Sequence, residues 1–295
     1  QLPWCARLLG VPLLLPVLLW QAPRPPAGEF EVLAADVGQG NAVLVRTATH
    51  TLVYDTGPGY SRETDAGQRV LVPLLRAFGE TVHTVVLSHR DLDHTGGAGA
   101  VLRMQPGAAL LSSLEDGHAL RALRPGPRCT AGLQWDWDGV RFSILHPAAA
   151  DYDSPGRPNT VSCVLRISTS RATALLAGDI EKAQEATLVA RGDGELRADL
   201  LLVPHHGSKT SSSAPFLAAV QPAIAIVQAG YRNRFGHPAG DVVERYRAAG
   251  VRLEASFRCG AASWRSQSPA AVTCERARSP RYWQHRAEAP TQQGE

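Results

Sequence analysis

The stretch HRDLDHTGG at residues 89–97 decides the fold of this chain, and it follows directly on the apolar run VVLS at residues 85–88. Two imidazoles and two carboxylates therefore crowd onto one loop at the end of a predicted strand. A lone histidine is more often structural, but nitrogen and oxygen donors that converge in this way are what divalent metal ions require. The loop predicts the centre of a metallo-hydrolase site.

Three further strand ends carry donors of the same kind. Asp179 follows the apolar run at residues 175–177, the pair His205-His206 follows the run at 201–203, and His237 lies in the segment FGHP at 235–238. Each signal is weak alone, because an aspartate at a strand end commonly caps a helix, and Asp179 precedes one. Together they predict strand-end loops from two halves of a layered fold that meet at one edge.

The hydrophobic pattern predicts short strands and helices that alternate in two successive halves. Strands are expected at residues 31–37, 41–47, 51–55, 83–87, 109–111, 140–145, 162–167, 173–177, 199–203, 223–228 and 252–254, and helices at 66–78, 98–104, 181–190, 214–220 and 241–249. Trp135 and Trp137 alternate in a further strand and are expected to pack. This order indicates two mixed sheets enclosed by helices.

Composition sets only loose limits on function. The chain has 295 residues, 44% of them hydrophobic and 19% charged, which suits one large α/β domain or two small ones. A formal net charge of +3 gives weak support for a polyanionic partner. The five cysteines form no CxxC metal pattern. Cys259 and Cys274 either close a hairpin by a disulfide, which needs an oxidising compartment, or remain two reduced thiols.

The ends of the chain differ from its centre. Residues 8–20 carry no charge but are too few for a membrane span, so residues 1–29 are expected to be the end of a membrane segment, or a secretory core, followed by a Pro-rich linker. Residues 30–255 form the predicted domain. Residues 256–295 are expected to be an extension that is partly mobile, with a polar tail from Ala287 onward.

The order of the motifs, with DVGQG at residues 36–40 and YDTG at 54–57 ahead of them, resembles the metallo-β-lactamase superfamily. It is most similar to the C-terminal domain of ComEC-type DNA-internalisation proteins, over about residues 30–252. The resemblance implies the four-layer αββα sandwich of that superfamily, with the site along the shared edge of two sheets.

The resemblance also implies roles for the donors. One metal ion would be held by His89, Asp91 and Asp179, and a second by Asp93, His94, Asp179 and His237, so that Asp179 bridges the two. Asp55 would orient ligands through hydrogen bonds. Asp93 is expected to be essential for catalysis, and His205, slightly favoured over His206, to protonate the leaving oxygen.

This chain departs from the superfamily pattern at two positions. Asp91 stands where a second histidine is usual, and no histidine lies between His146 and His205 to supply a third imidazole. Asn159 or Ser162 is expected in that place, as a weak oxygen ligand or a neighbour of the ligands. An oxygen-rich site favours Mn²⁺, with Mg²⁺ or Zn²⁺ as alternatives.

The function implied by the resemblance is a metal-dependent DNA nuclease in a competence DNA-uptake channel. It would degrade the single strand of DNA that is not transported, and its partners would be the membrane channel part of the same polypeptide and other competence proteins. The domain would lie on the extracytoplasmic face of the inner membrane. Arg232 and Arg234 suit backbone phosphates, whereas Lys209 lies in a serine-rich loop that serves equally well to cap the next helix. The alternatives are a hydrolase of a small thioester, lactone or lactam, and a non-catalytic domain that guides DNA.

Overall fold

Two seven-stranded sheets packed face to face form the centre of the computed structural model, which describes residues 3, 10–19, 22–153, 156–192 and 194–282. In spatial order, the first sheet consists of β14 (Val272–Cys274), β13 (Ala262–Arg265), β1 (Glu31–Ala34), β2 (Ala42–Arg46), β3 (Thr51–Thr56), β4 (Thr84–Leu87) and β5 (Ala109–Ser112). The second consists of β12 (Arg252–Ala255), β11 (Ile224–Val227), β10 (Leu200–Leu202), β9 (Thr173–Leu176), β8 (Val164–Ser168), β7 (Val140–His146) and β6 (Gln134–Trp137).

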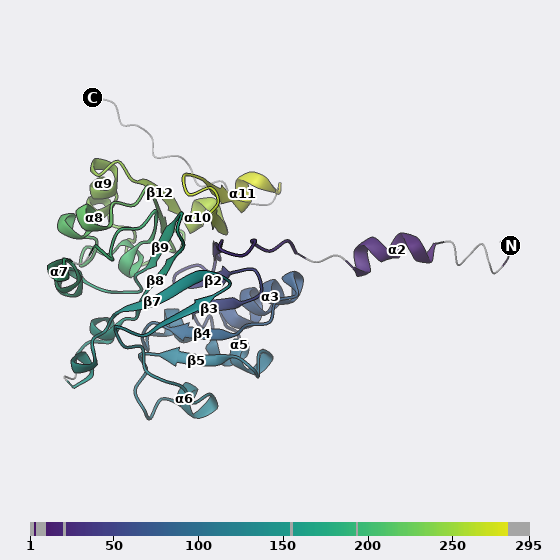
Figure 1. Ribbon diagram of the computed structural model, residues 1–295, viewed down its shortest axis with the longest axis horizontal. Helices are drawn as coiled ribbons and strands as arrows, with labels where there is room; N and C mark the ends of the chain where they lie inside the picture. The colour runs from purple at the N-terminus through teal and green to yellow at the C-terminus, as the bar shows by residue number, and fades with distance from the viewer. Residues whose placement is uncertain (1–2, 4–9, 20–21, 154–155, 193, 283–295) are drawn as a thin grey trace.

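Helices cover the outer faces of both sheets (Figure 1). The first sheet carries α3 (Val72–Phe78) and α5 (Ala98–Met104), and the second carries α7 (Lys182–Arg191), α8 (Ala214–Val220) and α9 (Gly240–Ala248). The shorter helices are α4 (Leu92–Thr95), α6 (Ala119–Leu123), α10 (Ser256–Cys259) and α11 (Glu275–Arg278), with 3-10 turns at Ala149–Tyr152, Pro158–Val161 and Pro204–Gly207. The predicted four-layer αββα sandwich is confirmed.

The central strands read as unbroken apolar runs because both of their faces are buried. Val86 of β4 points into the core between the sheets, whereas Val85 and Leu87 pack against the helices of the first layer. In β10, Leu202 faces the other sheet and Leu201 faces the outer helices. Strands β3, β4 and β5 run parallel, as do β9, β10 and β11. Their carboxyl ends therefore deliver the following loops to one edge of the sandwich.

Several predicted elements have different bounds in the structure. The strand expected at residues 31–37 ends at Ala34, because the chain then turns through Gly38 and Gly40, both at positive φ. The helix expected at 66–78 begins as a π-helical segment, Gly67–Leu71, and becomes α3 with Pro73 in its first turn.

Residues beyond the expected domain boundary at 255 complete the first sheet. Strand β13 pairs antiparallel with β1, Val32 opposite Trp264, and β14 pairs with β13. These strands lacked a clear hydrophobic period in the sequence, and pairing with β1 defines them. The polar tail expected to be mobile from Ala287 onward lies outside the described residues.

Two disulfides are present among the described residues. Cys259 and Cys274 are bonded, the pairing that the sequence left open. A second bond, between Cys129 and Cys163, was not anticipated, because 34 positions separate the two cysteines and no motif connects them. It ties the loop before β6 to the start of β8.

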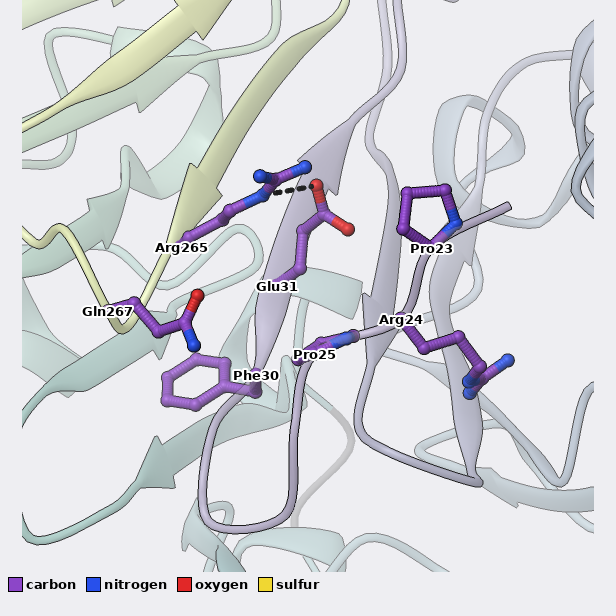
Figure 2. Close-up of a pocket in the computed structure, with 7 residues that line it drawn as sticks. All are labelled: Pro23, Arg24, Pro25, Phe30, Glu31, Arg265 and Gln267. Atoms are coloured by element: carbon purple, nitrogen blue, oxygen red, sulfur yellow. Dashed lines mark hydrogen bonds and ion pairs between the residues drawn. The ribbon is translucent and has the colours of Figure 1, made fainter. Parts of the chain in front are cut away.

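The Pro-rich segment before β1 is docked on the first sheet. Arg24 donates hydrogen bonds from Nε to the carbonyl oxygens of Thr47 and Ala48, and its guanidinium pairs with Glu80. Figure 2 shows this segment beside Glu31, which accepts from Nε of Arg265 at 3.2 Å. Farther towards the N-terminus, α2 (Val11–Leu18) stands away from the sandwich (Figure 1). Within the described residues, no helix has the length and apolar character needed to cross a bilayer.

Candidate metal centre

His94 is held by the carboxylate at the end of β3. Its Nδ1 lies 2.7 Å from Oδ2 of Asp55, and both side chains are fully buried. Asp55 also accepts from the Ser88 amide at 2.7 Å and from the Ser88 hydroxyl at 2.8 Å. Because the Nδ1 proton of His94 is directed at Asp55, Nε2 is left to face the centre, which is the orientation that a metal-ligating histidine requires.

His206 is held in the same way from the other sheet. Its Nδ1 donates to the carbonyl oxygen of Gln228, at the end of β11, over 2.8 Å. Nε2 then lies 3.2 Å from Nε2 of His94. The Gln228 side chain spans the two sheets, because its Nε2 donates to the Ala35 carbonyl oxygen and its Oε1 accepts from the Ala42 amide. Gln228 therefore holds the ring of His206 in place and also binds the neighbouring edge of the first sheet.

Two carboxylates complete the cluster. Asp179, which follows β9, places Oδ1 3.2 Å from Nε2 of His94 and Oδ2 3.5 Å from Nε2 of His206. Asp93 places Oδ2 3.2 Å from Nε2 of His206. The donor atoms form two overlapping groups, one of His89, His94 and Asp179, the other of Asp93, His94 and His206; within each group they lie within 4.8 Å of one another.

The charges of the cluster shift its proton affinities. Burial disfavours the imidazolium form of His94, but the carboxylates of Asp179 and Asp55 outweigh it and hold the pKa of His94 well above its ordinary value. Burial likewise opposes a raised pKa of His206, and Asp179 and Asp93 overcome it. Conversely, burial favours the neutral form of Asp93, yet His206 and His94 lower its pKa to about 2. The carboxylates therefore stay ionised, and a proton or another cation is required between the imidazoles.

The residues present fit divalent cations. Two buried nitrogen atoms of the cluster have no hydrogen-bond partner, Nε2 of His89 and Nδ1 of His237, and Oδ1 of Asp179 has only the ion pair with His94. Unpaired buried donors and acceptors are costly, and a metal ion would satisfy them. Two neutral imidazole nitrogens facing each other at 3.2 Å also repel unless a cation lies between them. The donor set is therefore chemically suited to metal ions.

The backbone around the cluster is tightly constrained. Gly40 lies so close to Asp93 that a β-carbon there would come within 2.2 Å of the Asp93 carbonyl oxygen. His205 and His206 both adopt left-handed backbone conformations, with φ of 49° and 53°. Such angles are rare for residues with a side chain and commonly mark functional sites. Here they turn two consecutive histidines towards the same edge.

The remaining predicted ligands lie around these two groups. Oδ2 of Asp91 is 3.6 Å from Nε2 of His89, and the Asp91 side chain is 45% exposed. The His237 ring is 6.4 Å from that of His206 and 5.8 Å from that of His205, measured between centroids. Among the described residues, neither Asp91 nor His237 belongs to the two compact donor groups. Their assignment as ligands stays a prediction.

The two residues expected in place of the third imidazole occupy different positions. The hydroxyl of Ser162 accepts from the Asp179 amide at 2.8 Å, so Ser162 positions the loop of Asp179. Asn159 lies in the 3-10 turn before it, where its carbonyl oxygen accepts from the Ser162 amide. The imidazole at the centre of the cluster is that of His206, whose Nε2 groups with Asp93 and His94. From the sequence, His206 was predicted only as an alternative proton donor.

Sequence reasoning missed Ser88 and Gln228. Ser88 directly precedes His89, and its hydroxyl lies 2.8 Å from Asp55 and 3.0 Å from Nδ1 of His89. Gln228 was assigned only as the last residue of an apolar strand. The available signal was the same for both, a polar residue where a buried strand ends beside the predicted site.

The residues predicted to contact phosphate lie on exposed loops near the cluster. Arg232 and Arg234 lie on the loop that leads to His237, and Lys209 lies just beyond the pair His205-His206. A cavity of about 390 Å³ opens beside Arg90 of the metal loop and is lined by Arg128 and Arg157 together with acidic residues such as Glu115 and Asp151. Exposed basic side chains therefore occur on loops that carry or adjoin the predicted ligands.

Known proteins share the sequence and fold of this chain. The family model described as the metallo-beta-lactamase superfamily matches residues 35–231. Competence protein ComA of Neisseria gonorrhoeae is 37% identical over 253 residues, 85% of this chain and 34% of that protein. Recombination protein 2 of Haemophilus influenzae is 35% identical over 235 residues, 78% of this chain and 28% of that protein. The chain thus spans about a third of the length of these relatives.

A solved structure shares the fold at low sequence identity. The metallo-β-lactamase fold protein YhfI of Bacillus subtilis has a TM-score of 0.52 and 12% identity, over 80% of this chain and 99% of that chain. This likeness concerns the arrangement of sheets and helices.

Proposed function

Because the chain belongs to the metallo-β-lactamase superfamily, we propose that its domain is a metal-dependent nuclease that hydrolyses phosphodiester bonds in DNA. The observation that carries the proposal is one edge of the sandwich where imidazole nitrogens and carboxylate oxygens lie 3.2–3.5 Å apart and nearby loops carry exposed arginines. Metal ligands and phosphate-binding groups in one place suit a phosphodiester better than an uncharged substrate.

We propose that the cluster holds two divalent cations, supported by His89, His94, His206, Asp93 and Asp179. When bound, such cations activate water and neutralise the charge that develops on a phosphoryl group. Mn²⁺ remains the favoured ion. The position of His206 nevertheless adds a nitrogen donor to a site predicted to be oxygen-rich, which narrows the advantage of Mn²⁺ over Zn²⁺ and disfavours Mg²⁺.

His205 is the proposed proton donor for the leaving oxygen. Its Nδ1 lies 3.1 Å from Oγ1 of Thr210 and 3.4 Å from Oε1 of Glu181, so one side of the ring is anchored. Its Nε2 faces the cluster, 3.8 Å from Oδ2 of Asp179, and its side chain is partly exposed. His206 is enclosed and already engaged on both nitrogens, which leaves His205 with access to substrate.

The relatives supply the cellular context of the proposal. Their names refer to competence and recombination, both of which involve DNA. We place the domain in a DNA-uptake protein, where it degrades the strand that is not transported, beside a membrane channel in the same polypeptide and with other competence proteins as partners. Two disulfides support an oxidising compartment, and hence the extracytoplasmic face of the inner membrane.

The rival functions predict different results. A hydrolase of thioesters, lactones or lactams has no use for Arg232 and Arg234. The non-catalytic alternative rested on the lack of a third imidazole in the sequence motifs. His206 offers such an imidazole, because its Nε2 lies 3.2 Å from Nε2 of His94 and 3.2 Å from Oδ2 of Asp93. We therefore retain catalysis as the function.

The test compares DNA with acyl substrates in the presence of Mn²⁺ or Zn²⁺. We expect cleavage of single-stranded DNA and no turnover of a thioester, lactone or β-lactam panel. Asp93→Ala should lose at least about 10²-fold in cleavage, because it removes a proposed metal ligand, and removing a group that merely orients such a ligand already costs roughly 10- to 100-fold. Asp136→Ala is the matched control, an exposed aspartate whose side chain pairs with Arg141 on β7. Acyl turnover with intact DNA, or equal cleavage by Asp93→Ala, contradicts the proposal.

A further inference from the structure

Several exposed hydrophobic side chains lie on loops near the residues of the metal centre. Leu92 is 73% exposed, Phe235 53%, and Tyr231 and Tyr60 44% each. Leu92 lies between Asp91 and Asp93, and Phe235 lies two residues before His237. Soluble proteins seldom group large exposed hydrophobic residues without a binding role. The rim of the centre therefore offers contact surface beyond metal and phosphate ligands.

Phe235 continues a series of aromatic rings that leads out of the centre. Its ring lies 5.6 Å from that of His237 at an interplanar angle of 23°, and the His237 ring lies 6.4 Å from that of His206 at 21°. His237 thus lies between the exposed ring of Phe235 and His206, whose Nε2 belongs to the donor cluster. A planar ligand group stacked on Phe235 would extend this series next to the proposed scissile bond.

The loop that carries Phe235 is fixed in advance. Oδ1 of Asn233 accepts from the amides of Phe235 and His237, at 3.1 and 3.0 Å, and its Nδ2 donates to the Gly230 carbonyl oxygen at 2.9 Å. The Gly230 amide in turn donates to Oε1 of Gln39, in the loop between β1 and β2. A platform held in place before a ligand arrives costs little conformational entropy when the ligand binds.

The charges around the ring suit a nucleic acid. The guanidinium of Arg234 lies over the Phe235 ring at 4.8 Å, and that of Arg232 over the Tyr231 ring at 5.2 Å. Both arginines are exposed, and Phe235 remains half exposed beneath Arg234. A base can displace the guanidinium from the ring, and the guanidinium can then pair with the adjoining phosphate. Aromatic rings interleaved with basic groups are the usual means of binding single strands.

We propose that Phe235 is a stacking platform for one unpaired nucleobase next to the scissile phosphate, and that it makes the site selective for single-stranded over duplex DNA. In a duplex, each base is already stacked and paired, so its face cannot reach Phe235 without unstacking. This inference rests on the proposed function, since it takes the bound strand to be the substrate.

The test measures binding rather than turnover. Affinity of a fluorescein-labelled single-stranded 12-mer is measured by anisotropy for the whole chain, with Ca²⁺ and separately with EDTA. We expect Phe235→Ala to bind about 5- to 150-fold more weakly, the loss that corresponds to one stacked base, and Phe235→Trp to bind like the wild type. The matched control is Leu123→Ala on α6, 43% exposed, with unchanged affinity. We expect Phe235→Ala and the wild type to bind a 12-mer duplex with equal affinity.

An abasic nucleotide moved along the 12-mer identifies the stacked base. At one position it should weaken binding to the wild type and have no further effect on Phe235→Ala. An abasic penalty of equal size in both proteins, or an equal loss for single strand and duplex, overturns the platform. If Phe235→Ala abolishes binding to phosphatidylglycerol vesicles and leaves the 12-mer unaffected, the rim contacts a membrane and the inference is wrong.

The outcome is separable from that of the nuclease proposal. Cleavage that depends on Asp93 but is indifferent to Phe235→Ala, in rate and in strand preference, rejects the platform and retains the nuclease. Stacking of an unpaired base without any cleavage by the wild type rejects the nuclease and retains a single-strand binding site.

Discussion

Replacing Asp55 by Asn tests whether the carboxylate at the end of β3 sets the proton position on His94. Asp55 accepts three hydrogen bonds on two oxygens: the Ser88 amide on Oδ1, and the Ser88 hydroxyl with Nδ1 of His94 on Oδ2. An asparagine keeps one acceptor oxygen and presents an NH₂ group in place of the other. In either orientation, this NH₂ group meets a donor that Asp55 satisfied.

The size of the effect follows from these contacts. If the amide oxygen faces the Ser88 amide, the NH₂ group faces His94, whose proton must move to Nε2, the nitrogen that faces the cluster. We expect metal affinity to fall by about 10- to 100-fold, as is typical when the partner that orients a ligating histidine is lost. We also expect the metal-free protein to lose about 1.5–3 kcal/mol of unfolding free energy, since a buried, charge-assisted hydrogen bond is replaced by a mismatch.

Metal affinity is measured by competition with a chromophoric chelator, and stability by denaturant unfolding in EDTA. Asp138→Asn is the control, because Asp138 also accepts more than one hydrogen bond, from the Thr47 hydroxyl at 2.6 Å and the Thr49 amide at 2.7 Å. These contacts lie beside the start of β3, whereas Asp55 lies at its end, so the control should lose stability and keep its metal affinity. Asp55→Asn with wild-type metal affinity and reduced stability would refute the role assigned to Asp55.

Two further predictions concern the disulfide behind the centre and the protons within it. Replacing Cys129 and Cys163 together by Ala should lower the unfolding free energy by about 4 kcal/mol, the loop-closure value for their separation of 34 residues; an unchanged denaturation midpoint would contradict this. The raised pKa values of His94 and His206 mean that their protonated forms stabilise the metal-free fold at low pH and that this contribution is lost as pH rises. Metal ions must displace those protons, so we expect metal affinity to increase with pH. Calorimetry in two buffers of different ionisation enthalpy should detect the released protons. Identical heats of binding in both buffers would contradict proton release.

The sandwich could be predicted because its strands are buried on both faces and end in polar loops. The run at residues 85–87 has no alternation, which is typical of a strand enclosed between two layers. Glycines at 96 and 97 marked the tight passage from the metal loop to α5, where a β-carbon on either would come within 2.4 Å of neighbouring backbone atoms. Local chemistry was sufficient for these elements.

The arrangement of donors could not be predicted to the same depth. Whether His205 or His206 faces the centre depends on the left-handed backbone angles at both residues, and a histidine in the sequence does not predict such angles. The hydrogen bond from His206 to the Gln228 carbonyl oxygen joins residues 22 positions apart. Any residue type can supply a backbone carbonyl oxygen, so the sequence does not identify this acceptor. Motif spacing thus pointed to the donors that the two compact groups contain, but not to their orientation or to Ser88 and Gln228, which hold them in place.

The position of the centre at the junction of the two sheets explains why so many of its supports are contacts between distant segments. Gln228 joins β11 to the start of β2. The hydroxyl of Tyr54, from β3, donates to the Cys163 carbonyl oxygen at 2.5 Å, and the Cys163 amide donates to the carbonyl oxygen of Ser88, the residue before His89. Asp93 and His94 come from one sheet, and Asp179 and His206 from the other. A shift of one sheet against the other would separate the donors, so we expect the contacts that fix the sheets to contribute to metal affinity alongside the ligands.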